Sequence, residues 1–336
     1  MLSVAIYAFN AVAPIITLIL LGTLARKTGM VSENAFKEIN RMNFRFAFSC
    51  MCFNNLYKTE SFDGFEPAFF VLVMATLLIM TGVGLALTTR VTKVRNRKGV
   101  LAQVFFRSNY AVIGLPVAAA LAGNEALALA SAYQVPTVIY FNFAAVLLLS
   151  VYSDNGSGVH FRKVAMSIAT NPLVIGLVSG AIVLFIRPHI PVGADGELVF
   201  SLKKNLPFVY QIISYLGSMA TPLALICLGG RLSAGEFGKY KKELIFANVM
   251  RLILVPLGAF TIALLASSAG LVELTPARTA VLVAVFASPI AVSTVAMAQE
   301  MGGDDALAGQ IVVTTSIFGM VSLFFWIFAV RLMGFL

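Results

Sequence analysis

Long apolar stretches separated by short polar connections make up almost the whole chain. A helix needs about 20 mostly apolar residues to cross a bilayer, and ten stretches approach or exceed that length. These stretches are 4–25, 39–57, 67–89, 100–123, 126–151, 164–186, 205–230, 244–272, 279–302 and 306–330. The pattern therefore predicts an all-α, polytopic membrane protein with ten transmembrane helices embedded in a lipid bilayer.

Composition supports a membrane protein and disfavours other classes. Of the 336 residues, 59% are hydrophobic and 12% are charged, whereas soluble domains carry about 25% charged residues. The net charge of +9 could suggest nucleic acid, but the basic residues lie mostly between apolar stretches, so we expect no nucleic-acid partner. Cys50, Cys52 and Cys227 lie inside apolar stretches and show neither a disulfide framework nor zinc spacing.

The Lys and Arg residues of the connections are unequally divided between the two sides that ten alternating helices would create. The richer side holds Arg26, Lys27, Lys37, Arg90, Lys93, Arg95, Arg97, Lys98, Arg162, Lys163, Arg231, Lys239, Lys241 and Lys242; the other holds Lys58, Arg187, Lys203, Lys204, Arg278 and Arg331. Since cytoplasmic loops are enriched in Lys and Arg, the richer side is predicted to be cytoplasmic. Both termini then face outward from the cell membrane, and the first stretch is a retained helix.

The two halves of the chain resemble each other. A shift of 180 positions gives nine identities over residues 106–128, among them Gly123 on Gly303, each followed two residues later by an acid. Each half would hold five helices, and two odd-numbered repeats must have opposite orientations, which is a common plan of secondary carriers. We therefore predict a first five-helix repeat at 1–151, a cytoplasmic linker at 152–163 and a second repeat at 164–336.

One apolar stretch in each half is expected to be broken. The fourth contains Arg107, Asn109, Gly114 and Pro116, and the ninth contains Pro289. Proline removes a backbone donor, and freed polar groups inside a bilayer must face protein or a wet cavity. At about 1.5 Å per residue, Asn109 and Pro289 would both approach the middle of the bilayer, so helices four and nine are predicted to cross there.

These residues resemble a known family. The pattern Asn109-x4-Gly114-Leu115-Pro116 is similar to the crossover motif of the auxin efflux carrier family, which includes plant PIN-type carriers and bacterial malate- or malonate-type permeases. The second half agrees with Ala287-Ser288-Pro289 and later Ile317-Phe318-Gly319. The resemblance implies two inverted five-helix repeats arranged as scaffold and transport domains, organic anions such as carboxylates as substrates, and a homodimer as a candidate assembly.

The candidate substrate-binding residues follow from the motif and its neighbours; they are Asn109, Gly114, Pro116, Ser288, Pro289, Arg107 and Gln134. Asn109 could contact substrate or join neighbouring helices. Helix two departs from the family pattern because residues 48–52 contain no mid-helix proline, so no contribution to the site is carried over from that helix.

Several polar residues leave alternatives open. Arg107 could attract a carboxylate, snorkel to the surface, or pair with Glu300. Gln134, with Tyr133 and Asn142, could point into the cavity or hydrogen-bond other helices. Deep arginines leave a similar choice: Arg41 is expected to snorkel, while Arg45 and Arg251 are candidates to line the cytoplasmic entrance.

The leading hypothesis is a secondary transporter of a small organic anion. A sodium- or proton-coupled exchanger with the related crossed-helix fold is an alternative, although Glu300 is the only acid in the apolar stretches that bears on it. A ligand-binding membrane sensor is another, although the short connections leave no room for an output domain. The sequence has no His/Asp/Glu cluster for metal or acid–base chemistry, so we expect no enzyme, no catalytic residue, no metal and no cofactor.

Overall fold

The computed structural model describes the chain except residues 1, 59–65, 154–161, 163–165, 167–168, 193–197 and 232–237, and gives only the backbone of residues 2–12. The described residues form helices and no β-strand. The helices are α1 Leu2–Lys27, α2 Glu33–Met42, α3 Phe48–Tyr57, α4 Pro67–Val91, α5 Arg95–Gln103, α6 Leu115–Tyr152, α8 Pro172–Ile186, α9 Leu202–Asn205, α10 Pro207–Arg231, α11 Lys241–Val249, α12 Val255–Ser268, α13 Pro276–Leu282, α14 Ser293–Glu300 and α15 Asp305–Leu332. The predicted linker 152–163 lies mostly outside the described residues.

Single turns of π-helix join or extend several of these helices. They are η1 Asn43–Ala47, η2 Tyr110–Gly114, η5 Met250–Leu254 and η6 Val283–Ala287. Through η1 the helices α2 and α3 form one continuous run, as α11 and α12 do through η5. Such π-turns are often found at functional sites, and η2 and η6 directly adjoin the two predicted helix breaks.

Helix ends follow local signals in the sequence. The side chains of Ser32, Asn171, Thr275 and Asp304 each accept a hydrogen bond from a backbone N–H in the first turn of the next helix, as N-caps do. Proline is the first residue of α4, α8, α10 and α13, where its missing N–H costs nothing. At Gly123 the backbone has φ 71°, which divides α6 into the two helices that the sequence predicts on either side of this residue.

Six helical runs among the described residues are long and apolar enough to cross a membrane. Their outward-facing side chains are apolar; Phe185 is 72% exposed, Phe208 63% and Leu265 64%. A surface of this kind suits contact with lipid tails, which are themselves apolar. The prediction of an all-helical, multi-pass membrane protein is confirmed, while the number of ten helices stays a prediction.

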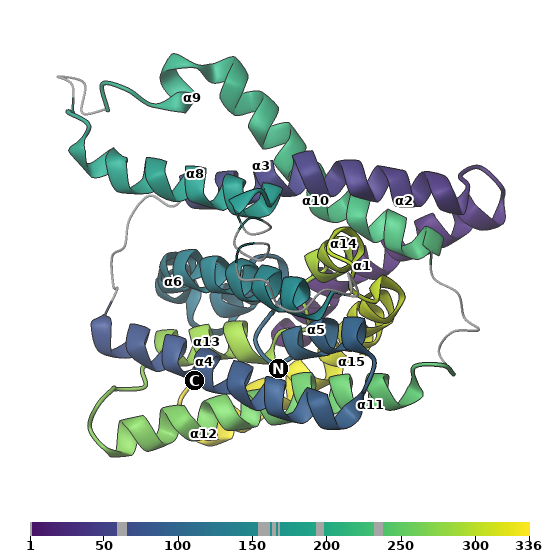
Figure 1. Cartoon of the computed structure of the whole chain (residues 1–336). Helices are drawn as coiled ribbons and strands as arrows, with labels where there is room; N and C mark the ends of the chain where they lie inside the picture. Colours follow the sequence, from purple (N-terminus) through teal and green to yellow (C-terminus); the bar gives the residue numbers. More distant parts are fainter. Residues whose placement is uncertain are drawn as a thin grey trace.

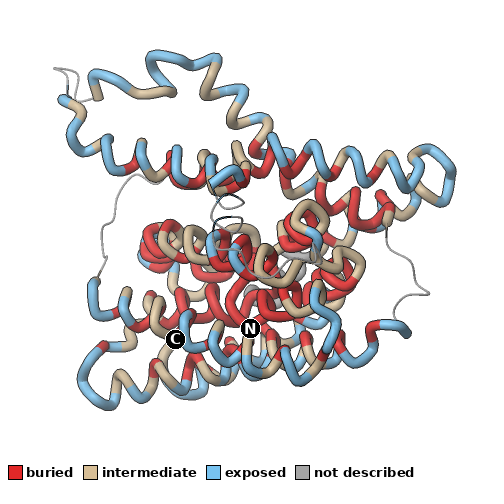
Figure 2. Tube along the Cα trace, in the orientation of Figure 1, coloured by how far each residue is buried: buried red, intermediate tan, exposed pale blue. Residues whose placement is uncertain are grey.

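The helices pack in two groups, each drawn from both halves of the chain. The first helix group contains α1, α2, α3, α8 and α10, and the second contains α4, α5, α6 and α11 to α15. Figure 1 shows the first group above the second, with α1 between them. Helix α1 packs on α10 of its own group and also contacts α15 and α6 of the second group. Buried residues gather in the middle of the molecule, where the groups meet and within the second group (Figure 2).

Glycine allows the close helix contacts of the first group. A Cβ on Gly22 of α1 would lie 1.9 Å from the carbonyl oxygen of Ile226, and a Cβ on Gly229 of α10 would lie 1.8 Å from that of Ile19. A Cβ on Gly176 of α8 would lie 2.2 Å from the carbonyl oxygen of Ser49. Small residues let membrane helices approach this closely, so the first group packs backbone against backbone.

Candidate functional site

The chain unwinds at one point in each half, and the two unwound segments lie against each other. Residues 104–109 connect α5 to η2, as a turn at 104–106 and an unwound segment at 107–109, and the unwound residues 288–292 connect η6 to α14. Ser108 and Ile290 form an isolated antiparallel bridge, and the backbone N–H of Asn109 donates to the carbonyl of Pro289 at 2.8 Å. Two backbone groups freed by the breaks therefore satisfy each other, as a low-dielectric interior demands.

The first break lies earlier than the motif predicts. Pro116 lies in the first turn of α6, where proline is tolerated, and its side chain is exposed. The unwound residues instead are Arg107, Ser108 and Asn109, which follow α5 after the turn at residues 104–106. In the second half Pro289 lies within the break itself. The break near Gly114 and Pro116 predicted from the sequence is thus displaced by about two helical turns.

Gly114 and Gly319 make room for the crossing. A Cβ on Gly114 would lie 2.8 Å from the carbonyl oxygen of Ala284 and 2.7 Å from the ring of Tyr110. A Cβ on Gly319 of α15 would lie 2.8 Å from the ring of Pro289. Both family-motif glycines therefore serve close packing of η2, η6 and α15 around the crossing.

A small cavity of about 70 Å³ lies beside the crossing, where the two helix groups meet. It is lined by Phe48, Met51, Cys52, Asn55, Arg107, Ser108, Asn109, Tyr110, Ala111, Val112, Val138, Phe141, Asn142, Leu173, Thr221, Ala291, Val292 and Ser293. These residues come from α3, α8 and α10 of the first group and from both unwound segments, η2, α6 and the start of α14 in the second. Its volume has room for a few water molecules.

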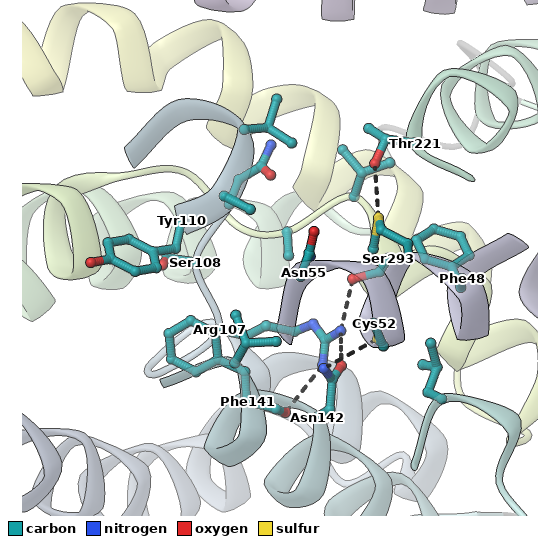
Figure 3. A pocket seen from close by; sticks show the side chains of 18 residues that line it. Phe48, Cys52, Asn55, Arg107, Ser108, Tyr110, Phe141, Asn142, Thr221 and Ser293 are labelled. Atoms are coloured by element: carbon teal, nitrogen blue, oxygen red, sulfur yellow. Dashed lines mark hydrogen bonds between the residues drawn. The ribbon is translucent and has the colours of Figure 1, made fainter. Parts of the chain in front are cut away.

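Arg107 is the charged residue among those lining the cavity. Its guanidinium donates to the carbonyl of Phe141 at 3.1 Å, to Asn142 Oδ1 at 2.9 Å and to Ser293 Oγ at 2.7 Å. Figure 3 shows the guanidinium held between these three residues, close to Cys52. None of the three carries a charge, so the positive charge of Arg107 is hydrogen-bonded but not neutralised by them.

Three side-chain polar atoms of the residues that line the cavity have no hydrogen-bond partner among the described residues. They are Arg107 Nε, Ser108 Oγ and Asn109 Nδ2, all buried. A buried donor without a partner costs free energy, about 1–3 kcal/mol from mutational data. Unpaired donors beside a cavity are therefore available to a ligand that brings acceptor oxygens.

A second arginine, Arg251 of η5, supports the crossing away from the cavity. Its side chain is fully buried, and it does not line the cavity. It donates to the carbonyl of Ser288 at 2.8 Å, to that of Val285 at 3.0 Å and to that of Val104 at 3.4 Å. Arg251, a candidate to line the cytoplasmic entrance, is instead enclosed by the backbone of the crossing.

The predicted site residues are brought together only in part. Arg107 and Asn109 line the cavity, whereas Gly114, Pro116, Ser288 and Pro289 form the frame of the crossing without lining it. Gln134 of α6 does not line the cavity either, although Val138 one turn later does. Of its two predicted companions, Asn142 bonds Arg107, and the hydroxyl of Tyr133 donates to the carbonyl of Glu66 away from the cavity.

The second predicted helix, residues 39–57, contributes more to the cavity than the family resemblance implies. Phe48, Met51, Cys52 and Asn55 of α3 all line it. Their spacing of i, i+3, i+4 and i+7 is that of one helical face, and this periodicity was the available signal. A π-turn, η1, precedes them in place of the missing proline. Thr221 and Ser293, from the second half, also line the cavity and carried no separate signal.

Glu300 pairs with Arg41 of α2 and Arg45 of η1, and not with Arg107. Its carboxylate lies 3.1 Å from Arg41 Nε and 3.6 Å from Arg45 Nε. Both arginines remain more than half exposed, so they reach the surface as well as the ion pair. These contacts join α2 and η1 of the first group to the end of α14 in the second.

An apolar outer surface, long helices and a cavity with a buried arginine between two helix groups are the features of an integral, multi-pass membrane protein. Residues 7–327 match the profile of a family described as "Membrane transport protein". The chain belongs to that family, which confirms the resemblance to auxin efflux carriers.

Two archaeal proteins, both named only as uncharacterized transporters, are similar to this chain over most of their length. The protein from Methanothermobacter thermautotrophicus is 25% identical over 324 residues, covering 94% of this chain and 96% of its own. The protein from Methanocaldococcus jannaschii is 27% identical over 274 residues, covering 78% of this chain and 81% of its own.

Proposed function

We propose that this transporter is a secondary carrier that moves a small organic anion, a carboxylate, by alternating access. The observation that carries the proposal is Arg107, a guanidinium that is only 2% exposed and lines the cavity at the crossing. Ionisable residues inside membrane proteins are costly and usually mark substrate or ion pathways. A carboxylate would neutralise Arg107 and accept hydrogen bonds from its free Nε and from Asn109 Nδ2.

The division into two helix groups supports alternating access. The cavity lies between the groups, so a displacement of one group against the other would expose it to one side and then the other. We infer that the first group is the scaffold and that the second, which contains both broken helices, moves. This arrangement is the one expected of ten helices in two inverted repeats, 1–151 and 164–336.

The cavity size indicates a closed conformation. Sites that hold drug-sized ligands measure about 300–1,000 Å³, and this cavity measures about 70 Å³. Even a small carboxylate would require the groups to separate slightly. We therefore infer a small substrate, bound with the cation and donors of the crossing around its carboxylate and apolar residues such as Phe48 and Val138 around the remainder.

The remaining features of the proposal rest on charge distribution and family membership. The protein would lie in the cell membrane with its Lys- and Arg-rich connections in the cytoplasm and both termini outside. A homodimer is the proposed assembly. A ligand-binding sensor built on the same fold is the second candidate from another class, and movement of ligand into sealed vesicles separates the two.

The experiment that tests the anion is a competition between acid and ester forms. Purified protein is screened for thermal stabilisation by mono- and dicarboxylates, since a ligand that binds the native state raises its stability. The best ligand is then compared with its methyl ester at fixed pH and salt. We expect the ester to bind at least tenfold more weakly, because it cannot neutralise Arg107. Equal stabilisation by acid and ester would exclude the carboxylate.

Two substitutions connect the ligand to the site. Arg107→Gln should abolish stabilisation by the acid while leaving the ester's weak effect unchanged, because only the charge is removed. Asn109→Ala should abolish uptake into vesicles at near-normal expression, because it removes the free amide donor at the crossing. Gln134→Ala, outside the cavity, is the control and should transport normally. Full transport by Asn109→Ala would remove this residue from the site.

A further inference from the structure

The crossing contains a buried cation that the proposed site does not use. Arg251 is fully buried in η5, and among the described residues it is bonded to three backbone carbonyl oxygens and to no carboxylate. A buried charge needs compensation by partners with excellent geometry. Here the compensation comes from the backbone of the two broken helices.

The three carbonyls share a position in the fold. Val104 is the C-cap of α5, and Ser288 is the C-cap of η6, which also contains Val285. The carbonyls at the C-terminal end of a helix lack partners inside it and carry the negative end of the helix dipole. Arg251 therefore binds the negative ends of both broken half-helices at once, where they meet at the crossing.

Carriers with broken helices use carbonyl oxygens at such ends as ligands for a coupling cation. We propose that Arg251 is a tethered cation, which occupies in this protein the position that a free Na⁺ would take and holds the crossing without it. Arg251 is a positioning residue, because it bonds Ser288 and Val104 while Arg107, on the cavity side, is left for substrate. The inference rests on the proposed carrier function only for its effect on transport, and its effect on stability needs no substrate.

The two arginines are held differently, which supports separate roles. Arg107 bonds one carbonyl and two side chains, Asn142 and Ser293, and retains a free Nε. Arg251 has no unpaired side-chain nitrogen that is buried and bonds only carbonyls. The first is open to a ligand beside a cavity, whereas the second is enclosed by the backbone it supports.

The test is thermal unfolding of the full-length, detergent-purified protein without substrate, in sodium, potassium or choline chloride at equal ionic strength. The wild type should melt at the same temperature in all three salts. Arg251→Ala should melt lower and regain roughly 2–5 °C with millimolar guanidinium, in a saturable manner, because a free cation then occupies the carbonyl site. Arg251→Lys keeps the charge, so its melting temperature should lie between those of the wild type and Arg251→Ala. Guanidinium should not raise it.

Phe105→Ala is the matched control, because it removes a buried apolar side chain beside the same crossing and leaves the cation in place. It should melt lower and show no recovery with guanidinium. The proposal is overturned if guanidinium raises Arg251→Ala no more than Phe105→Ala, or if Arg251→Lys is as unstable as Arg251→Ala. If Arg251→Ala does not accumulate, the wild type decides, since a sodium-specific rise in its melting temperature would also overturn the proposal. Failure here leaves the acid–ester competition unaffected.

Discussion

At the scale of single residues, two buried arginines at the crossing carry positive charge with no carboxylate bonded to them among the described residues. Arg107 and Arg251 are each held by neutral oxygens, from carbonyls and from the side chains of Asn142 and Ser293. A guanidinium suits this role because it presents five donors in a fixed geometry and stays charged. The arrangement leaves the crossing electropositive, which favours an anionic ligand over an amine or a neutral sugar.

Gly114 gives a prediction at this scale. Gly114→Ala places a Cβ against the carbonyl of Ala284 and the ring of Tyr110, so η2 and η6 must separate. Forcing an extra methyl into a packed core costs about 1–3 kcal/mol. We therefore expect a lower melting temperature and a clear loss of uptake, measured on purified protein and in vesicles respectively.

Gly82→Ala is the matched control for that substitution. Gly82 lies in the middle of α4, is exposed, and would place its Cβ in open space. Alanine is a better helix former than glycine, so Gly82→Ala should be neutral or slightly stabilising and should transport normally. If both variants behave alike, the crossing does not depend on the close approach at Gly114.

At the scale of elements, the segment where α14 ends and α15 begins joins the two helix groups. It runs from Gln299, near the end of α14, to Asp305, the first residue of α15, and we name it the 299–305 turn. Gln299 accepts from Arg231 at 2.6 Å and from Asn40 at 2.8 Å, and its own amide donates to the carbonyl of Lys37 at 2.9 Å. All three partners lie in α2 or α10 of the first group.

The acids of the same turn extend the connection in both directions. Glu300 pairs with Arg41 and Arg45, and Asp305 pairs with Arg231. Asp304 instead bonds Arg97 and the hydroxyl of Tyr240 inside the second group and caps α15. If the second group moves away from the first at this turn, the contacts of residues 299, 300 and 305 break. The bonds of Asp304 stay intact, because its partners move with it.

These contacts predict that the 299–305 turn holds the Lys- and Arg-rich side of the cavity closed. In Glu300→Gln with Asp305→Asn the ion pairs between the groups are lost, and the closed state should become less favoured. Cys52, which lines the cavity, should then react faster with a thiol reagent applied from that side. Because partly exposed ion pairs contribute about 0–1 kcal/mol each, we expect an increase of roughly threefold to tenfold.

Glu33→Gln is the control, because Glu33 pairs with Arg26 and Lys37 on the same face but within the first group. It should leave the labelling rate of Cys52 unchanged. Labelling that does not change in the double variant would show that the turn does not control access to the cavity.

At the scale of the whole molecule, polar contacts near the helix ends gather on two opposite sets of connections. On one set, Arg97 bonds both Glu243 and Asp304, which joins the starts of α5, α11 and α15. On the other, Arg278 pairs with Glu66 at the starts of α13 and α4. Each contact joins connections that the Lys and Arg count assigns to the same side, while the alternation of all ten helices stays a prediction.

Which set faces the cytoplasm is a prediction from the positive-inside rule. In a variant whose native cysteines are replaced, Lys93→Cys should be labelled only from the cytoplasm and Lys203→Cys only from outside. Both positions are exposed, and they lie in the α4–α5 connection and in α9. Asp63 follows Lys58 in a connection assigned to the outer side, so a cysteine there is also expected to be labelled only from outside, but it lies outside the described residues. Labelling of Lys93→Cys from outside would show that every helix has the opposite orientation to the predicted one.

The sequence by itself determined the class of the protein and the approximate helices. The starts of α4 and α8 and the division of α6 at Gly123 follow from proline, N-caps and positive φ, which act within a few residues. The same local character explains why the polar interruptions at Arg107, Asn109 and Pro289 are visible in the sequence. Apolar length and polar interruption are properties of a segment, and the bilayer makes both of them strict.

Only the tertiary structure decided which polar groups meet. The placement of the first break at residues 107–109, ahead of Pro116, depends on the backbone bond from Asn109 to Pro289, more than half the chain length away in sequence. The partners of Arg107, Arg251 and Glu300 likewise come from distant segments. The sequence leaves several possible partners open for each of these polar residues. The packing of the two helix groups decides which carbonyls and acids come within hydrogen-bond distance.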